Sequence, residues 1–530
     1  MGGGSSVEKG CIIEFTEDRG LTIVQLKALY EKIKKKCAAG KLMRSGELEP
    51  LRPEQVNLYD INDRIIKKYT AHKSCSYVEL IATRQQSPNW FVSHWWGNSV
   101  LNMINCLEQH AIDRGLVPKK TGTKEYDFTK CTAVYWVCAY ANNQHSLGGE
   151  ISADPAQSSF RRAMARCDGT ISIVDMTCET FGRLWCDYEI FVSTLAVKVV
   201  NASYLFDAYT FDPTHRKAVG ICDGLAAVDA HEWDKESREA AFPLDRIKRA
   251  LGFRFQDSHA SREDDAKHIR NAIALQPLES PPLREHPNYE RLNNVVRGKF
   301  LVPVLYRLMK QGCTGSELSQ MMHALKLSEA ESLRVDFEKM KVEMDAFTKI
   351  TESLPHTLLS LRNVALPLEL SPHLQQLISH VPALTYLNLA GNKIGDPGMV
   401  SIAGGLRCIP ALRLLNLEDN DIGDEGAQRL AVGLQVVPVM QELYLFGQVM
   451  SDVGASSLAE QLVHLSALEK MTFDEEFFTI YEQAATSVPS LAALELDSIA
   501  ASIPPSGANA ATTMSVRINN SIACKTLLDS

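Results

Sequence analysis

The sequence lacks the motifs of several large classes of enzyme and metalloprotein. None of its 13 cysteines forms a C-x-x-C pair, so no cysteine spacing indicates a zinc site. It also contains no G-x-x-x-x-G-K-[ST] loop, no H-E-x-x-H helix and no G-x-S-x-G turn. The sequence therefore offers no motif for P-loop nucleotide hydrolysis, zinc proteolysis or serine hydrolysis.

Long apolar runs and an excess of basic residues are absent too. No stretch of about 18 apolar residues and no signal-peptide core occurs, so we expect neither a membrane-spanning nor a secreted protein. The 64 Asp and Glu residues outnumber the 55 Lys and Arg residues, and a net charge of -9 does not favour nucleic-acid binding. Free thiols in a reducing cytoplasm are the simplest interpretation of the odd number of cysteines.

The start of the chain qualifies the prediction of a cytoplasmic protein. Residues Met1 to Ser6 fit the M-G-x-x-x-[ST] pattern, which predicts myristoylation of Gly2 and peripheral membrane contact. One acyl chain binds membranes only marginally, so a second signal is needed. Candidates for that signal are Lys32, Lys34, Lys35 and Lys36 after an amphipathic helical pattern, and Cys11 as a second acylation site. The alternative is a flexible Gly/Ser tail beside a solvated lysine face.

A 28-residue period organises the C-terminal part of the chain. Leu384-x-x-Leu387-x-Leu389-x-x-Asn392 recurs from Leu412 and again, less regularly, from Met440. Weaker copies at Leu359, Leu468 and Leu491 bring the count to about six units. Asp396, Asp424 and Asp452 share one phase, where a carboxylate can cap the helix amides. These features predict a strand-plus-helix solenoid that resembles ribonuclease-inhibitor-type leucine-rich repeats.

The strands of such a solenoid alternate leucines, which point inward, with residues that face the concave side. The predicted concave residues are Tyr386, Asn388, Asn416, Glu418, Glu442, Tyr444, Phe446 and Asp474. Aromatic residues of this kind are enriched at binding hot spots, and the acids favour a protein partner with basic character. The alternative is that a preceding helix, for example residues 315–349, covers these aromatics.

Strand-like and helix-like segments alternate between residues 88 and 210. The predicted strands are 90–94, 132–140, 170–175 and 203–209, and helical patterns at 99–114, 158–167 and 183–199 separate them. This order predicts a parallel sheet with helices on both faces. Ligands of such sheets bind at the carboxyl ends of the strands. We therefore expect His94, His145 and Glu189 to converge at that edge.

Three motifs in this region resemble the Toll/interleukin-1 receptor (TIR) superfamily. They are Phe91-Val92-Ser93-His94, Tyr135-Trp136-Val137 before the loop 141–155, and Trp185-Cys186-Asp187-Tyr188-Glu189. Ser93-His94-Trp95-Trp96-Gly97, Asn143-Gln144-His145 and Arg183 are similar to a divergent protist and algal branch. The resemblance implies a TIR/flavodoxin-like α/β fold.

In enzymatic TIR domains the glutamate of W-C-x-x-E supports cleavage of NAD between nicotinamide and ribose. The resemblance therefore implies that Glu189 is catalytic, since a carboxylate can stabilise the oxocarbenium character of the ribose. The implied substrate-binding residues are His94, Trp95, Trp96, His145 and Trp185. NAD would be a substrate, and no cofactor or metal is expected. The alternatives are core positions for Trp185 and Cys186, structural histidines and a surface glutamate.

Many TIR domains act only as adaptors, so two functions stay open. One is a signalling protein that self-associates through the TIR-like domain and binds a protein partner through the repeats. The other is an NAD glycohydrolase regulated by the repeats. The predicted division is 1–75 N-terminal helical region, 76–255 TIR-like domain, 256–350 linker and helical connector, 351–500 repeats and 501–530 flexible tail.

Overall fold

The computed structural model divides the chain into two compact units, residues 1–304 (unit 1) and residues 305–530 (unit 2). The structure describes residues 10–44, 49–150, 152–224, 232–310, 315–328, 332–337, 343–462 and 465–473, together with 480, 483, 494–497 and 514–518. Two predicted functional residues, Gly2 and Asp474, lie outside this part of the chain.

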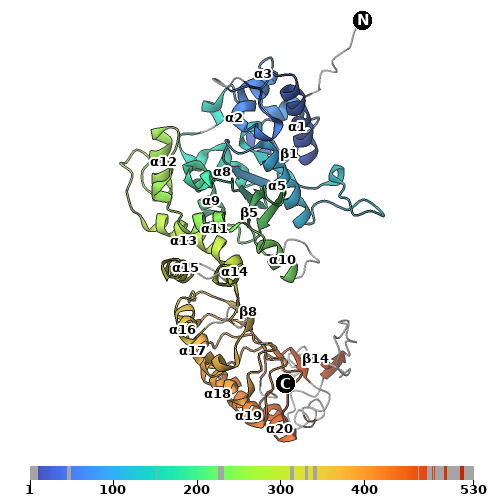
Figure 1. Ribbon diagram of the computed structural model, residues 1–530, viewed down its shortest axis with the longest axis vertical. Helices are drawn as coiled ribbons and strands as arrows, with labels where there is room; N and C mark the ends of the chain where they lie inside the picture. Colours follow the sequence, from blue (N-terminus) through green and yellow to red (C-terminus); the bar gives the residue numbers. More distant parts are fainter. Residues whose placement is uncertain are drawn as a thin grey trace, which may run out of the picture. The chain divides into compact units, whose positions relative to one another are not determined.

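Unit 1 is built around a mixed sheet, which has six strands among its described residues (Figure 1). The strands are β1 (Leu21–Thr22), β2 (Trp90–His94), β3 (Val134–Val137), β4 (Gly169–Ile173), β5 (Leu205–Asp212) and β6 (Lys217–Ile221). Their order is β1-β3-β2-β4-β5-β6. The four central strands are parallel, and β1 and β6 are antiparallel to their neighbours. The predicted parallel sheet is confirmed, whereas neither of the two antiparallel edge strands, β1 and β6, was predicted.

The central strands are buried on both sides, as expected for a parallel sheet covered by helices. All five residues of β2 and all five of β4 are buried. Phe91 and Trp136 stack with ring centroids 5.1 Å apart on neighbouring strands. The order β3-β2-β4 places the first strand of the parallel set in the middle, so the chain reverses direction across the sheet at β2. Ligand sites of open α/β sheets lie at such switch points.

The helices of unit 1 connect and cover these strands. They are α1 (Ile23–Ala38), α2 (Leu58–Ile61), α3 (Lys67–Thr70), α4 (Tyr77–Ile81), α5 (Val100–Asp113), α6 (Cys138–Ala141), α7 (Leu147–Glu150), α8 (Ser159–Met164), α9 (Leu184–Phe191), α10 (Glu232–Glu239), α11 (Leu244–Leu251), α12 (Glu263–Ile273) and α13 (Pro287–Leu301). The predicted strand 132–140 is shorter than expected, because the chain turns into α6 at Cys138. α5 packs on β5 and β6, while α8 and α9 pack on β2.

Unit 1 extends to Val304, beyond the boundary predicted at residue 255. The segment expected to be a linker folds back onto the sheet domain. Within this segment, Asn293 Oδ1 on α13 accepts a hydrogen bond of 2.8 Å from the backbone of Phe255, the last residue of the predicted sheet domain. The hydroxyl of Tyr289 on α13 donates one of 2.9 Å to the carbonyl of Arg270 on α12. Hydrogen bonds between segments far apart in the sequence therefore join α12 and α13 into one block.

Unit 2 contains a row of parallel strands followed by helices. The strands are β7 (Ser332–Asp336), β8 (Ser360–Ala365), β9 (Tyr386–Asn388), β10 (Leu414–Asn416), β11 (Glu442–Tyr444) and β12 (Lys470–Phe473), joined through β14 (Met514–Ile518) to β13 (Leu494–Asp497). The helices are α14 (Leu305–Lys310), α15 (Gly315–Leu327), α16 (Met344–Glu352), α17 (Leu374–Ser379), α18 (Gly395–Leu406), α19 (Asp424–Leu434) and α20 (Asp452–Leu462). Helices α17 to α20 pack each against the next (Figure 1).

The strand register reproduces the 28-residue period. Leu387 pairs with Leu415, Leu415 with Leu443, and Leu443 with Met471. All four side chains are buried. Between the strands, Asn420 donates to the carbonyls of Leu389 and Leu417 at 2.9 and 2.8 Å. The repeated asparagine therefore ties each turn to the one before it, which is why it belongs to the period.

The repeated aspartates cap a different helix from the one predicted. Asp396 lies in the first turn of α18, yet its Oδ1 accepts from the backbone amides of Gly423 and Gly426 at 2.8 and 2.9 Å. Asp424 on α19 accepts in the same way from Ser451 and Gly454 before and within α20. Each carboxylate thus satisfies amides at the start of the helix in the following repeat.

The repeats begin earlier and end differently than the sequence predicted. Ser332 and Leu333 of β7 pair with Ser360 and Leu361, so residues within the predicted helix 315–349 form a strand one period ahead. At the other end β13, predicted as a further repeat, is antiparallel to β14. β14 itself lies in the predicted flexible tail. In the described residues of both units, no helix is long and apolar enough to cross a membrane.

Candidate functional site

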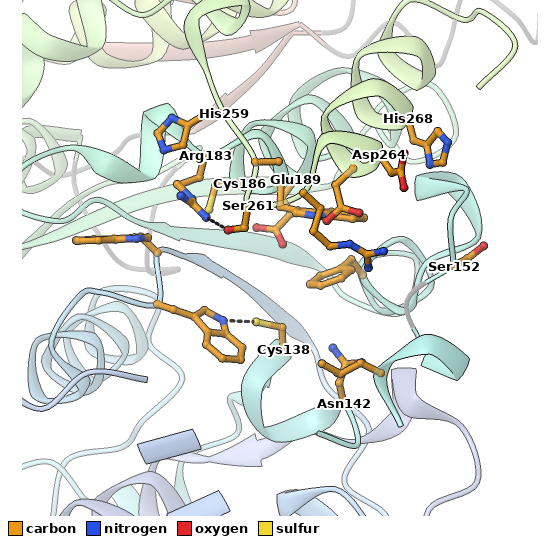
Figure 2. A pocket seen from close by; sticks show the side chains of 18 of the residues that line it. Cys138, Asn142, Ser152, Arg183, Cys186, Glu189, His259, Ser261, Asp264 and His268 are labelled. Carbon is orange, nitrogen blue, oxygen red and sulfur yellow. Dashed lines mark hydrogen bonds between the residues drawn. The ribbon is translucent and has the colours of Figure 1, made fainter. Parts of the chain in front are cut away.

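A cavity of about 590 Å³ lies at the carboxyl ends of β2 and β3 in unit 1. This volume is in the range that binds small organic ligands. Five of the predicted site residues line it: His94, Trp95, Trp96, Trp185 and Glu189. In Figure 2, Arg183, Cys186 and Glu189 lie on one side of the cavity, and Cys138 and Asn142 lie opposite them. The cavity sits at the switch point of the sheet, where the sequence placed the site.

Glu189 lies on α9, one turn after the start of the helix. Its side chain lines the cavity although the residue is only 5% exposed. Burial raises the pKa of its carboxyl to about 8, and the neighbouring Ser93 hydroxyl opposes part of this shift. The carboxyl is therefore mostly protonated at neutral pH. Perturbed acids in a cavity are typical of functional sites.

His94 ends β2 and is 6% exposed. Neither of its ring nitrogens makes a hydrogen bond of good geometry among the described residues. Burial lowers the pKa of His94 to about 4, although the backbone of Val92 lies close enough to oppose part of this fall, so the imidazole is neutral at physiological pH. A buried polar group without a partner costs free energy unless a water or ligand satisfies it. His94 therefore offers one donor and one acceptor to an occupant of the cavity.

Aromatic rings form much of the cavity wall. Trp185 and Phe160 stack with centroids 5.1 Å apart and an interplanar angle of 28°. Trp96 packs against Tyr59 at 5.5 Å, and its Nε1 donates to Cys138 Sγ at 3.2 Å. These contacts hold the indoles in fixed orientations. The cavity therefore presents flat apolar surfaces beside the polar groups of His94 and Glu189.

Residues between His259 and His268 form a second wall of the cavity, and they come from the segment predicted to be a linker. His259 exchanges backbone hydrogen bonds with Gly182 and Leu184, at 2.9 and 3.0 Å, at the start of α9. Arg183 Nη2 donates to Ser261 Oγ at 2.8 Å, as the dashed line in Figure 2 shows. Trp185 Nε1 donates to Asp265 Oδ2 at 3.1 Å. Sequence patterns gave no signal for this wall, because its residues follow the sheet in no recognisable motif.

His145 does not line this cavity. Its side chain is exposed at the protein surface, and its Nε2 lies 2.8 Å from the hydroxyl of Thr70. The neighbouring loop residues Asn142 and Gln144 line the cavity instead. Gln144 Oε1 is buried without a hydrogen-bond partner within the described structure. The sequence motif thus located the right loop, whereas the polar groups at the cavity are those before the histidine.

The site contains no ligand set for a metal. Across the described residues, no group of three or more His, Cys, Asp and Glu side chains is arranged to hold an ion. The cavity is lined by a protonated carboxyl, a neutral imidazole, side-chain amides and indole rings. Arg183 and Arg262 line it as well. This combination fits a ligand with a flat ring and several hydrogen-bonding groups, including anionic ones.

The strand face of the repeats is a second candidate site in unit 2. We use this name for the half-exposed residues of β9 to β12 and of the positions just after them: Tyr386, Asn388, Asn416, Glu418, Glu442, Tyr444, Phe446 and Lys470. They alternate with buried residues, as the strand pattern predicts. Lys470 Nζ lies 2.9 Å from the hydroxyl of Tyr444, which also bonds Glu442.

Of the two predicted resemblances, comparison with known proteins supports only the leucine-rich repeats. A family model described as Leucine Rich repeat matches residues 382–403 and 410–431. The match lies within unit 2 and gives no support to the TIR-like resemblance of residues 88–210. No curated protein matches the chain. Leucine-rich repeats indicate a protein-interaction role, because their stacked strands provide extended binding surfaces.

Proposed function

We propose that unit 1 binds NAD in the cavity and cleaves the bond between nicotinamide and ribose, while the repeats bind a protein partner that regulates it. The observation that carries the proposal is the position of Glu189. Its carboxyl lines a cavity with aromatic walls, and the residue is almost fully buried. The strand order β3-β2-β4-β5 is also the order expected of a TIR/flavodoxin-like sheet, which supports the resemblance.

The proposed reaction is hydrolysis of an N-glycosidic bond. The bond between ribose C1′ and the pyridinium nitrogen breaks, and its electron pair leaves with nicotinamide, which becomes neutral. The ribose then carries oxocarbenium character, and the Glu189 carboxylate stabilises this positive charge. Water adds to C1′ and loses a proton to solvent, which gives ADP-ribose. Stacking of the nicotinamide ring on Trp185 or Trp96 would hold the leaving group in place.

The electrostatics of the cavity are consistent with this substrate. Glu189 is mostly protonated at pH 7 because burial raises its pKa to about 8. The pyridinium ring of NAD is positively charged, and an adjacent cation favours the ionised form of a carboxyl group. Substrate binding would therefore lower the pKa of Glu189 and generate the carboxylate that the reaction needs. A neutral ligand of the same shape would not do so.

The test is release of nicotinamide from NAD by the purified full-length chain. We expect release by the wild type and a loss of at least about a hundredfold in Glu189→Gln, in line with removal of a group that stabilises transition-state charge. Glu239→Gln is the matched control, because Glu239 is 4% exposed and does not line the cavity. Equal release by wild type and Glu189→Gln would assign the chemistry to another residue.

The adaptor function is the remaining alternative for unit 1. In that case the unit self-associates and the repeats recruit a partner without any NAD cleavage. The half-exposed Tyr444 and Phe446 on the strand face support partner binding under either proposal. Absence of nicotinamide release at protein concentrations high enough for self-association would favour the adaptor.

A further inference from the structure

Two helical segments of unit 1 carry a charge opposite to that of the whole chain. Residues 31–41 and 63–73 together contain nine Lys and Arg and two Asp and Glu residues, a net charge of +7 in a chain of net charge -9. The basic residues are Lys32, Lys34, Lys35, Lys36, Lys41, Arg64, Lys67, Lys68 and Lys73. The rest of the chain is therefore strongly acidic, and these segments are a local exception.

The fold brings the two segments together. Residues 31–41 form the end of α1 and the turn after it, and residues 63–73 contain α3. Lys36 Nζ on α1 lies 5.2 Å from the centre of the Tyr69 ring on α3. Ile33 of the first segment and Ile65 and Ile66 of the second belong to the same hydrophobic core. The apolar faces of both segments are thus buried in this core, and their basic faces remain at the surface.

Few of these charges are neutralised within the segments. Lys34 pairs with Glu31 at 2.5 Å, and Lys67 pairs with Asp63 at 2.9 Å. Lys35, Arg64, Lys68 and Lys73 are exposed and make no ion pair within the described residues. We call the surface formed by residues 31–41 and 63–73 the basic face. Its uncompensated side chains give it a positive potential that extends into solvent.

We propose that the basic face is a docking surface for an anionic lipid bilayer. Charge complementarity is the first argument, because basic clusters on a protein surface bind the negative headgroups of such membranes. The second is the aromatic content of the face: Tyr69 is 38% exposed, and Lys34 lies 5.5 Å from the ring of Tyr30. Tyrosine and lysine with apolar stems are residues typical of the membrane interface.

The chain also brings apolar surface to this end of unit 1. Cys11 donates a backbone hydrogen bond of 3.0 Å to Glu79 on α4, and α4 packs on α3. The next residue, Ile12, is 92% exposed. An exposed isoleucine on a segment bonded to α4, the helix that packs on α3, favours a lipid surface over a nucleic acid, because a nucleic acid offers no apolar layer for it to enter. The docking is independent of any activity in the cavity.

The test is co-sedimentation of the full-length, unlipidated chain with vesicles of phosphatidylcholine, with and without phosphatidylserine. We expect binding only to the anionic vesicles, with release at high salt. Each basic residue at a membrane surface contributes roughly fivefold to binding, so Lys35→Glu/Lys68→Glu should weaken it at least about tenfold. Lys119→Glu/Lys124→Glu, at exposed positions outside the basic face, changes the net charge equally and should leave binding within about twofold.

Three results would overturn the proposal. They are equal binding to neutral and anionic vesicles, equal loss in the two double variants, and binding of duplex DNA by the wild type without binding of vesicles. Intrinsic tryptophan fluorescence checks that both variants stay folded, since all six tryptophans lie in unit 1.

Discussion

The indole nitrogen of Trp185 donates a hydrogen bond to Oδ2 of Asp265, 80 positions later in the chain, over 3.1 Å. Trp185 belongs to the W-C-x-x-E motif, whereas Asp265 belongs to the segment that the sequence placed in a linker. The contact joins α9 to α12, and both residues line the cavity. The site is therefore assembled from two parts of unit 1, and only one of them carries a recognisable motif.

Asp265 is expected to act as a positioning residue for Trp185. Asp265→Ala removes the acceptor of the indole hydrogen bond, so we expect KM for NAD to rise about three- to tenfold with a smaller change in kcat. Asp265→Asn keeps an acceptor oxygen and should restore most of the affinity. Quenching of tryptophan fluorescence by iodide provides a readout without activity, and it should increase in Asp265→Ala alone. Glu263→Ala, on the same helix but outside the cavity, should behave as wild type.

The pH dependence of NAD cleavage should report Glu189. Because the carboxylate is the form that acts and burial raises its pKa to about 8, we expect kcat/KM to increase from pH 6 towards pH 9. In the profile of kcat, the same increase should occur at a lower pH than in the profile of kcat/KM. The reason is that the bound pyridinium favours the ionised carboxyl of Glu189 and so lowers its pKa. Steady-state rates across this range test both statements. A kcat/KM that falls with increasing pH would show that Glu189 acts as a protonated acid.

The same carboxyl should make unit 1 less stable as the pH increases. In the unfolded chain Glu189 ionises near pH 4.3, whereas in the folded chain it stays protonated up to about pH 8. The folded state thus binds more protons in this window, and its stability declines with pH. Glu189→Gln removes this penalty. We expect nearly equal stability of the two proteins near pH 4 and an advantage for the variant on the order of 4 kcal/mol at pH 7.5.

Urea unfolding followed by tryptophan fluorescence provides this comparison, because it reports on unit 1 alone. An advantage for Glu189→Gln that is the same at pH 4 and pH 7.5 would contradict the expected linkage. The functional meaning would be direct, since a residue that destabilises its own fold is commonly retained for activity.

The repeated asparagine should be essential for the stability of unit 2. Asn420 is fully buried and bonds the carbonyls of Leu389 and Leu417. Asn420→Ala leaves these buried carbonyls without that donor, and we expect a loss of about 2–4 kcal/mol. Asn388→Ala, at a half-exposed strand position, should cost less than about 1 kcal/mol. Far-UV circular dichroism should record an earlier transition for Asn420→Ala, with unchanged tryptophan fluorescence of unit 1.

Binding through the strand face is tested by removing its aromatic residues. Tyr444→Ala/Phe446→Ala should weaken retention of a partner by at least about tenfold, because aromatic anchors dominate binding at such surfaces. Val432→Ala/Val453→Ala, at exposed positions of α19 and α20, is the control. A partner captured by the wild type and retained equally by the strand-face variant would exclude this surface.

The sequence predicted the parts of the molecule in which one local pattern sets the structure. The 28-residue period gave the register of Leu387, Leu415 and Leu443, because a buried leucine every period leaves no other alignment of the strands. A different pattern, a short run of mostly apolar or small residues, located β2 and β4. The rule that polar groups after parallel strands meet at one edge predicted a shared site for His94, His145 and Glu189, and of these His94 and Glu189 line the cavity whereas His145 does not.

Features that depend on contacts between distant segments were not predictable. The wall between His259 and His268 is held by hydrogen bonds to Gly182, Leu184 and Trp185. No sequence pattern within the wall segment indicates these contacts. β6 was missed because an antiparallel edge strand of five residues has little periodicity to detect. The chain from Ser332 to Asp336 was assigned to a helix since the repeat motif is degenerate there.

The aspartates of the repeats have a consequence for how this protein can change in length. Asp396 and Asp424 each reach amides 27 and 30 positions ahead, so these two junctions between neighbouring repeats are chemically the same. Loss or duplication of one complete 28-residue segment within this stretch would rejoin an aspartate to an equivalent pair of amides. Insertions of any other length would separate them. Gene rearrangement can therefore vary the size of the array in whole steps without creating an uncapped helix.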